Sequence, residues 1–243
     1  MAPYRMRNAA ARTAAWYTRR HVQKDAATVQ AMFSDIAPRY DLLNHLLSLN
    51  VDRRWRRRAA ALARPLGPVL DICTGTGDLA AAMAEAAGRT VLGLDFCGPM
   101  LRRGKDKRSC ASVRFLRGDA LRLPLPSDRF DVVSVGFGIR NVSDLDLGLR
   151  EMVRVARPGG RIVILEFREP RNPAIRFYFG RILPFIGNLV SRSRAYTYLN
   201  RSVLVWTKEA ELRARMLAAG CGAVTVHRLF PMAAVHLGVK AGG

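Results

Sequence analysis

Short apolar runs alternate with helical stretches over the middle of the chain, and this alternation constrains the fold more than any other feature. Five runs have the length and composition of buried strands, at residues 68–73, 91–95, 113–116, 130–135 and 161–167. Strands that alternate with helices form a parallel sheet with helices on both faces. Beyond them we expect a helix over 208–219 and two strands, around 223–228 and 233–239, close enough to pair antiparallel. The sequence therefore predicts an α/β, Rossmann-like fold with a mostly parallel seven-stranded sheet.

The residues before the first strand fall into two parts. Residues 1–24 are basic, rich in Arg and Ala, and contain no acidic side chain. This predicts a flexible basic tail over residues 1–25, although the composition also fits an organellar transit peptide. Residues 26–63 carry apolar side chains at helical spacing, interrupted at Pro38, and are expected to form a helical N-terminal extension. We expect a single domain over residues 26–243, with the Rossmann-like core at residues 64–243.

The net charge is +21, from 40 Lys and Arg against 19 Asp and Glu. Such a charge attracts polyanions, here nucleic acid or the anionic face of a membrane, but it can equally serve solubility alone. The arginine run at residues 53–58 has the same two interpretations, a solvated helix face or a membrane contact. No stretch is long and apolar enough for a transmembrane helix. The four cysteines lack metal-ligand spacing, so we expect reduced thiols, no metal and a cytoplasmic protein.

A glycine-rich turn, Asp71-Ile-Cys-Thr-Gly-Thr-Gly-Asp78, follows the first predicted strand. Gly75 and Gly77 let the backbone turn tightly and approach a ligand, and the next helix offers free N–H groups at its start. Asp95 ends the second strand, where a carboxylate can accept both hydroxyls of a ribose. This arrangement suits a dinucleotide or S-adenosylmethionine.

Three features favour S-adenosylmethionine. Asp71 precedes the turn on its strand, and Asp119 follows the third strand, where it can accept the amino group of adenine. The expected antiparallel pair at the end of the sheet is typical of class I methyltransferases. We therefore expect a class I methyltransferase fold with S-adenosylmethionine as co-substrate. The rival, a dinucleotide-dependent oxidoreductase, depends on the Gly75-x-Gly77-x-x-Ala80 match alone.

Five segments carry a more specific resemblance. They are Met32-Phe-x-x-Ile-Ala-x-x-Tyr40-Asp-x-x-Asn44, Trp55 in its basic helix, Leu70-Asp-x-x-x-Gly-Thr-Gly-Asp78, Phe137-Gly-Ile-Arg-Asn-Val142 and Arg157-Pro-Gly-Gly-Arg-x-x-x-Leu-Glu-Phe167. In these segments the chain resembles the menaquinone and ubiquinone C-methyltransferase family of quinone biosynthesis, over roughly residues 26–240. The glycine turn is shared with most methyltransferases, whereas the Tyr-Asp-x-x-Asn and Phe-Gly-Ile-Arg-Asn segments are more restricted to this family.

The resemblance implies which residues contact the cofactor. Besides the glycine turn, the matching positions are Thr76, Asp95, Asp119, Ala120 and Gly136. Two positions depart from the family pattern. Gly136 stands where serine is common, so a hydroxyl contact is lost while a backbone contact can remain. Asn200 stands where proline is frequent, and we expect it to loosen a loop over the substrate.

The resemblance also implies methyl transfer to a ring carbon of a polyprenylated quinol, either demethylmenaquinol or the benzoquinol precursor of ubiquinone. The carbon becomes a good nucleophile when the quinol loses a phenolic proton, so the enzyme must align the reactants, relay that proton and stabilise the phenolate. We expect Arg140, Asn141 and Tyr40 to perform these tasks, with Asn44 orienting Tyr40 or the ring. The alternatives are a surface Arg140 paired with an aspartate at 144 or 146, and a structural Tyr40.

Residues 175–190 form an apolar stripe where class I enzymes place substrate lids. The stripe is either a wall for a polyprenyl tail or an ordinary core helix broken at Pro184. A quinol with such a tail stays in the membrane, so we expect the protein to associate peripherally with the anionic inner face of the membrane. The sequence leaves open whether the protein forms a homodimer.

Two rival functions stand beside this one, a second enzymatic function and a function of another class. The first is methylation of another small molecule or of RNA, but the sequence lacks an RNA-binding module, so nucleic acid is not the expected partner. The second is a non-catalytic quinone- or lipid-binding protein on a methyltransferase scaffold, against which the intact glycine turn and Asp95 argue.

Overall fold

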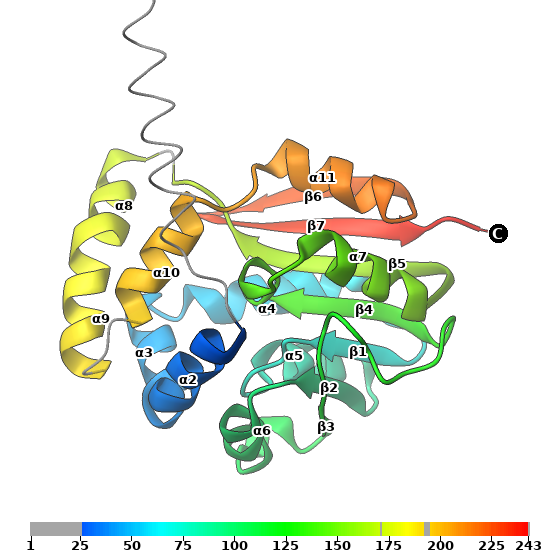
Figure 1. The fold of residues 1–243 in the computed structure, drawn as a ribbon, viewed down its shortest axis with the longest axis horizontal. Coiled ribbons are helices and arrows are strands. Elements are labelled where there is room, and N and C mark those ends of the chain that lie inside the picture. Colours follow the sequence, from blue (N-terminus) through cyan, green and yellow to red (C-terminus); the bar gives the residue numbers. More distant parts are fainter. Residues whose placement is uncertain (1–25, 171, 192–194, 243) are drawn as a thin grey trace, which may run out of the picture.

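A seven-stranded sheet runs through the centre of the computed structural model, which describes residues 26–170, 172–191 and 195–242 (Figure 1). The strands are β1 (Val69–Ile72), β2 (Val91–Asp95), β3 (Val113–Arg117), β4 (Phe130–Gly136), β5 (Ala156–Phe167), β6 (Cys221–Leu229) and β7 (Ala233–Lys240). Their order is β3-β2-β1-β4-β5-β7-β6, with β1 to β5 parallel and β7 antiparallel to both of its neighbours. The predicted α/β fold and antiparallel pair are confirmed. The tail predicted at residues 1–25 lies outside the described residues.

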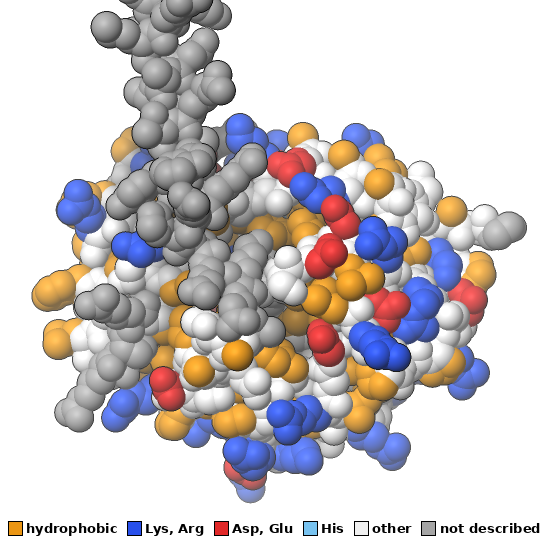
Figure 2. Space-filling view, viewed as in Figure 1, with side chains coloured by type: hydrophobic (Ala, Val, Ile, Leu, Met, Phe, Trp, Pro, Cys, Tyr) orange, Lys and Arg blue, Asp and Glu red, His pale blue; other side chains and the backbone are white. Residues whose placement is uncertain are grey.

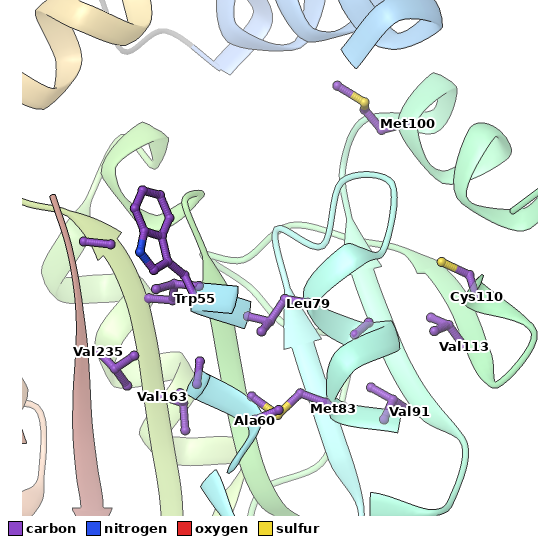
Figure 3. Close-up of a cluster of buried hydrophobic side chains, with 14 of the residues drawn as sticks. Trp55, Ala60, Leu79, Met83, Val91, Met100, Cys110, Val113, Val163 and Val235 are labelled. Atoms are coloured by element: carbon purple, nitrogen blue, oxygen red, sulfur yellow. The ribbon is translucent and has the colours of Figure 1, made fainter. Parts of the chain in front are cut away.

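Helices cover both faces of the sheet because its central strands are buried on both sides. The helices are α2 (Ala26–Ile36), α3 (Tyr40–Leu47), α4 (Val51–Ala63), α5 (Asp78–Ala87), α6 (Gly98–Lys105), α7 (Leu145–Val155), α8 (Pro173–Phe177), α9 (Leu183–Ser191), α10 (Ala195–Leu204) and α11 (Glu209–Ala218). On one face, Trp55 of α4 and Met83 of α5 share a buried core with Val163 of β5 (Figure 3). On the other face, Met152 of α7 and Leu212 of α11 belong to a second buried core.

Five helices, α2, α3, α8, α9 and α10, gather beyond the end of the sheet toward which β4 points (Figure 1). Within this helical cap, α3 contacts α9, and α9 contacts α10. Open α/β sheets bind their ligands at the carboxyl ends of the strands. The helical cap therefore stands over the edge of the sheet where a ligand is expected.

β5 begins earlier than the sequence predicts. It starts at Ala156, and its pairing with β4 jumps from Phe130–Ala156 to Val132–Arg161. The Pro-Gly-Gly segment at 158–160 therefore lies within the strand, where it interrupts the regular pairing with β4.

The apolar stripe at residues 175–190 lies on one continuous helical path. A π-helical turn, Tyr178–Ile182, joins α8 to α9, and Pro184 lies in the first turn of α9. The alternative of a helix broken at Pro184 is therefore wrong, because the local change of register accommodates the proline.

Asn200 supports this path from the neighbouring helix α10. In the π register the amide of Leu183 donates to the carbonyl of Tyr178, so the next carbonyl, that of Phe179, would need the amide of Pro184. Proline has no N–H to donate. The side-chain amide of Asn200 donates to the Phe179 carbonyl instead, at 2.9 Å. The expectation that Asn200 loosens a loop is wrong, because the residue lies within a helix and ties that helix to its neighbour.

Candidate active site

The glycine-rich turn between β1 and α5 forms one wall of a cavity at the carboxyl edge of the sheet. Gly75 and Gly77 have φ values of +58° and +85°, which favour glycine. A side-chain carbon at Gly77 would lie 2.8 Å from Cζ of Phe115, so a larger residue would displace that ring. Nothing lies within 4 Å of the equivalent position at Gly75. Gly75 therefore borders open space for a ligand, whereas Gly77 sets the turn from outside the cavity lining.

Asp95 projects into this cavity from the end of β2. Its Oδ2 accepts the backbone N–H of Gly75 and its Oδ1 accepts that of Cys97, each at 2.8 Å. Burial raises the pKa of this carboxyl, while the backbone hydrogen bonds oppose the rise. Each carboxylate oxygen keeps capacity for a second hydrogen bond. The two backbone donors therefore orient a carboxylate that can still accept the two hydroxyls of a ribose.

Asp71 lies in β1 beneath the turn and is almost fully buried. The hydroxyls of Thr74 and Ser134 each donate to its carboxylate at 2.6 Å. Burial outweighs these hydrogen bonds and raises the pKa of Asp71 to about 7. A cationic ligand in the cavity would favour the ionised form.

The other expected cofactor residues also line this cavity: Thr76, Asp119, Ala120 and Gly136. The hydroxyl of Thr76 donates to Asp41 of α3 at 2.6 Å, which joins the turn to the helical cap. Asp119 is exposed, and one of its oxygens accepts a backbone amide of its own loop. A side-chain carbon at Gly136 would lie 2.9 Å from Cδ2 of Leu79, so the glycine at this position gives that leucine room.

All four cysteines are free thiols. Within the part of the chain that the structure describes, no group of three or more His, Cys, Asp and Glu side chains is placed to hold a metal ion.

A second cavity, of about 450 Å³, lies between the helical cap and the sheet and is mainly apolar. Its volume falls within the range of roughly 300–1,000 Å³ that is usual for small-molecule sites. Trp55, Phe137, Phe167 and Phe179 line it and pack together, with ring centroids 4.5 to 6.2 Å apart in the contacting pairs. This second cavity offers aromatic and aliphatic walls to an apolar ligand.

Only part of the apolar stripe at residues 175–190 faces this second cavity. Ile175, Phe179 and Leu183 line it, whereas Ile186 and Val190 are exposed on the outer side of α9. The stripe therefore has two sides, one turned to the cavity and one to the surface.

The two cavities meet at four residues that line both: Phe33, Tyr40, Arg56 and Phe137. Burial raises the pKa of the Tyr40 phenol, against the guanidinium groups of Arg56 and Arg140 and a hydrogen bond with Asn44, which lower it. The phenol therefore stays protonated at neutral pH and can donate a hydrogen bond at the junction. Asn44 contacts Tyr40, as the sequence suggests.

Arg140 is buried rather than on the surface. Its Nη1 donates to Glu166 Oε1 at 2.9 Å and Oε2 at 3.2 Å, and its Nε donates to the hydroxyl of Ser202 at 3.3 Å. The alternative pairing with Asp144 or Asp146 is wrong: Asp144 caps α7, and Asp146 pairs with another arginine. Arg140 lines the second cavity, which we call the apolar cavity. It does not line the first cavity, beside the glycine turn, which we call the cofactor cavity because the expected cofactor residues line it.

Asn141 faces the opposite way from its neighbour. It lines the cofactor cavity, and its side-chain oxygen accepts the hydroxyl of Tyr198 at 3.2 Å. Because Tyr198 lines the apolar cavity, the pair forms part of the wall between the two ligand spaces.

Arg56 was not predicted to be a site residue, because it falls within an arginine run that was interpreted as a solvated helix face or a membrane contact. In the structure Arg53, Arg54, Arg57 and Arg58 are exposed, whereas Arg56 turns inward and pairs with Asp52. A signal was present: an acidic residue precedes Arg56 by one helical turn, and Trp55 of the apolar stripe is its direct neighbour.

The insertion of β7 antiparallel between β5 and β6 separates this sheet from the all-parallel sheet of dinucleotide-binding folds. With the cofactor cavity at the end of β1 and β2, it defines a class I S-adenosylmethionine-dependent methyltransferase. The chain belongs to the ubiE/COQ5 methyltransferase family, whose family model matches residues 20–240.

Curated relatives are similar over most of their length. The demethylmenaquinone methyltransferase of Thermus thermophilus is 48% identical over 217 residues, which cover 85% of this chain and 99% of the relative. The enzyme of the same name from Deinococcus radiodurans is 49% identical, covering 82% and 86%. The ubiquinone/menaquinone biosynthesis C-methyltransferase UbiE of Geobacter sulfurreducens is 45% identical, covering 87% and 88%.

Solved structures show the same fold at low sequence identity. A SAM-dependent methyltransferase from Thermotoga maritima superposes with a TM-score of 0.65 at 18% identity, covering 86% of this chain and 98% of that one. Phosphoethanolamine N-methyltransferase 2 of Haemonchus contortus, solved with S-adenosyl-L-methionine, has a TM-score of 0.54 at 15% identity and covers 73% and 49%.

Proposed function

We propose that this enzyme transfers the methyl group of S-adenosylmethionine to a ring carbon of a polyprenylated quinol, and that the quinol is demethylmenaquinol. The observation that carries the proposal is an apolar cavity that adjoins the cofactor cavity, with Tyr40 and Arg56 lining both. A quinol ring at this junction would face the transferable methyl group, with its apolar tail among the aromatic side chains. The names of two relatives at 48% and 49% identity favour demethylmenaquinol.

The residues at the junction suit the chemistry of a quinol. The quinol gives up its phenolic proton to solvent, and the methyl group moves from sulfur to carbon as the S–C bond breaks and a C–C bond forms, which leaves S-adenosylhomocysteine. The methylated carbon then releases its own proton to solvent and the ring regains its aromaticity. Negative charge develops on the quinol oxygen, and a guanidinium or phenol donor in a water-poor cavity stabilises it. We assign this role to Arg140 and to the protonated Tyr40, because both line the apolar cavity. Asn141 contributes to the wall that positions the two reactants.

A deletion strain tests the substrate. Loss of the gene should cause demethylmenaquinone to accumulate, and the purified protein should methylate that compound only when the quinone is kept reduced, because the oxidised ring is a poor nucleophile. Accumulation of a demethylated ubiquinone precursor would assign the benzoquinol instead. An unchanged quinone profile, or quinone binding without methyl transfer, would contradict the proposal.

The exposed apolar side chains of the helical cap support a membrane-bound substrate. Leu42, Leu46 and Leu49, in and just after α3, are 63%, 53% and 75% exposed, and Phe185 and Leu189 of α9 are 73% and 69% exposed. We call these five residues the apolar ridge. α3 and α9 are in contact, and Figure 2 shows apolar side chains projecting at the side of the molecule where Figure 1 places α8 and α9. Patches of this kind mark interaction surfaces.

The apolar ridge continues into the apolar cavity. Leu49 belongs to both, and Phe230, 83% exposed, also lines the cavity. Exposed Arg39, Arg53 and Arg181 lie on elements next to the ridge. Within the described residues no helix is both long and apolar enough to cross a bilayer. We propose that the ridge rests on the anionic inner face of the cytoplasmic membrane and that the prenyl tail passes over Leu49 into the cavity.

A further inference from the structure

The charged side chains that line the cofactor cavity are mostly acidic. Four aspartates line it, Asp71, Asp78, Asp95 and Asp119, and within the described residues Arg56 is the one Lys or Arg that does so. S-adenosylmethionine carries two cationic groups, its sulfonium and its ammonium, and a single anionic group, its carboxylate. In such a cavity the carboxylate has one cation to meet, because the aspartates would repel it elsewhere.

Arg56 has the donors that this contact needs. Its Nη1 donates to Asp52, whereas its Nη2 lies 3.8 Å from Oδ2 of Asp78, beyond hydrogen-bond distance. Nε and Nη2 thus make no hydrogen bond with the described residues, and a guanidinium binds a carboxylate through two such parallel donors. The guanidinium lies 5.7 Å from the ring centroid of Phe137, at the junction of the two cavities. Burial alone lowers the pKa of Arg56, but Asp78 and Asp52 outweigh it and raise the pKa, so the side chain stays charged.

Two other basic side chains lie near the site, but neither of them lines the cofactor cavity. Lys107 pairs with Asp78 and Asp41 and lines neither the cofactor cavity nor the apolar cavity. Arg140 pairs with Glu166 and lines the apolar cavity alone. Neither faces the cavity in which the cofactor binds.

We infer that Arg56 binds the carboxylate of S-adenosylmethionine from helix α4, and this rests on the methyl transfer proposed above. Three carbon atoms separate that carboxylate from the sulfonium sulfur, so a bound carboxylate keeps the sulfur within the length of this short arm from Arg56, near the junction with the apolar cavity. Arg56 is thus a positioning residue: it contacts the cofactor, and through the cofactor it directs the methyl group toward the quinol.

A pair of ligands tests the contact without depending on turnover. S-adenosylhomocysteine keeps the carboxylate, whereas 5′-methylthioadenosine lacks the whole amino-acid arm. By calorimetry, Arg56→Met should weaken binding of S-adenosylhomocysteine by about 10- to 100-fold, the range for a hydrogen bond to a charged group. Binding of 5′-methylthioadenosine should stay within about twofold of the unchanged protein. Arg56→Lys should recover part of the loss, because a point charge lacks the two-pronged donor geometry.

Arg57→Met is the matched control, because Arg57 is the exposed neighbour on the same helix. It should bind both ligands normally. If Arg56→Met weakens both ligands equally, or neither, the carboxylate contact is wrong. A protein that binds S-adenosylhomocysteine through Arg56 but methylates no quinol would overturn the proposed substrate and leave the contact standing.

Discussion

Arg140 shows how a residue with a proposed catalytic role can also stabilise the fold. It forms a buried ion pair with Glu166, and removing one partner of such a pair typically costs about 3–5 kcal/mol, because the other charge is left buried alone. A loss of activity in Arg140→Ala would therefore mix unfolding with chemistry.

A paired replacement separates the two effects. We expect Arg140→Met combined with Glu166→Leu to fold and to keep nearly normal affinity for S-adenosylmethionine, since Arg140 lies outside the cofactor cavity. Turnover on the reduced quinol should fall by about 10²–10³, the usual effect of losing a donor to a developing oxyanion. The control, Glu166→Gln alone, keeps the arginine and should retain more activity than the pair. If the pair turns over normally, Arg140 is structural and Tyr40 becomes the next residue to test.

His236 gives the stability a defined pH dependence. It is 3% exposed in β7, and neither ring nitrogen has a hydrogen-bond partner among the described residues. Burial lowers the pKa of His236 below its usual 6.5, against a smaller opposing effect of Glu209. The unfolded chain therefore binds a proton at a higher pH than the folded chain, and stability falls as the pH drops below about 6.5, by up to about 1.4 kcal/mol per pH unit.

Denaturant unfolding between pH 7.5 and 5 measures this effect. In His236→Leu the free energy of unfolding should fall less over that range of pH, because an apolar side chain of similar size replaces the titrating ring. His227→Leu, on the adjacent strand β6 and only half-buried, is the control and should change the slope little. Parallel curves for His236→Leu and the unchanged protein would show that other groups govern the acid response.

At the scale of elements, the path from α8 to α9 depends on a neighbouring helix. The side chain of Asn200 supplies the hydrogen bond that Pro184 cannot give to the Phe179 carbonyl. We expect Asn200→Leu to lower the free energy of unfolding by about 1–3 kcal/mol, the cost of leaving a buried carbonyl unpaired. Arg201→Leu, at an exposed site one residue along α10, should have little effect.

A double-mutant cycle ties this cost to the proline. In Pro184→Ala the backbone regains an N–H that can donate to Phe179, so Asn200→Leu should cost less there than in the unchanged chain. Strictly additive effects would mean that Asn200 acts by packing alone. Since α8 and α9 wall the apolar cavity, a loosened path should also raise KM for the quinol more than KM for S-adenosylmethionine.

For the whole molecule, the net charge of +21 and the apolar ridge predict reversible membrane binding. The protein should float with liposomes that contain phosphatidylglycerol at low salt, and binding should weaken as salt screens the charges. Replacing Phe185 and Leu189 with serine should weaken binding further at every salt concentration, because the apolar contact is not screened.

Leu66→Ser is the matched control for the ridge, since Leu66 is 79% exposed but lies outside the helical cap, between α4 and β1. It should bind liposomes as the unchanged protein does. Equal flotation with neutral and anionic liposomes would remove the electrostatic contribution. A dimer that the two ridge replacements dissociate, in a protein that does not float, would assign the ridge to a second copy of the chain.

Local patterns were enough to predict the fold and the cofactor side of the site. Short apolar runs and helical periods predict the order of strands and helices. A glycine turn has few backbone solutions, so Gly75 and Asp95 could be placed at the carboxyl edge of the sheet from the sequence alone. The resemblance to a family added Tyr40, Arg140 and Asn141.

Only the tertiary structure decided which arginine of the run at residues 53–58 faces the site, and which partners the polar side chains bind. Arg56 lies among four exposed arginines, and only the packing of α4 against α5, the sheet and α3 turns it toward the cofactor cavity. The partner of Arg140 is 26 residues away on β5, and Asn200 bonds to a carbonyl 21 residues away. Such contacts depend on distances in space that a helical or strand period does not encode, so the sequence determined the scaffold and the fold determined the charges at the junction.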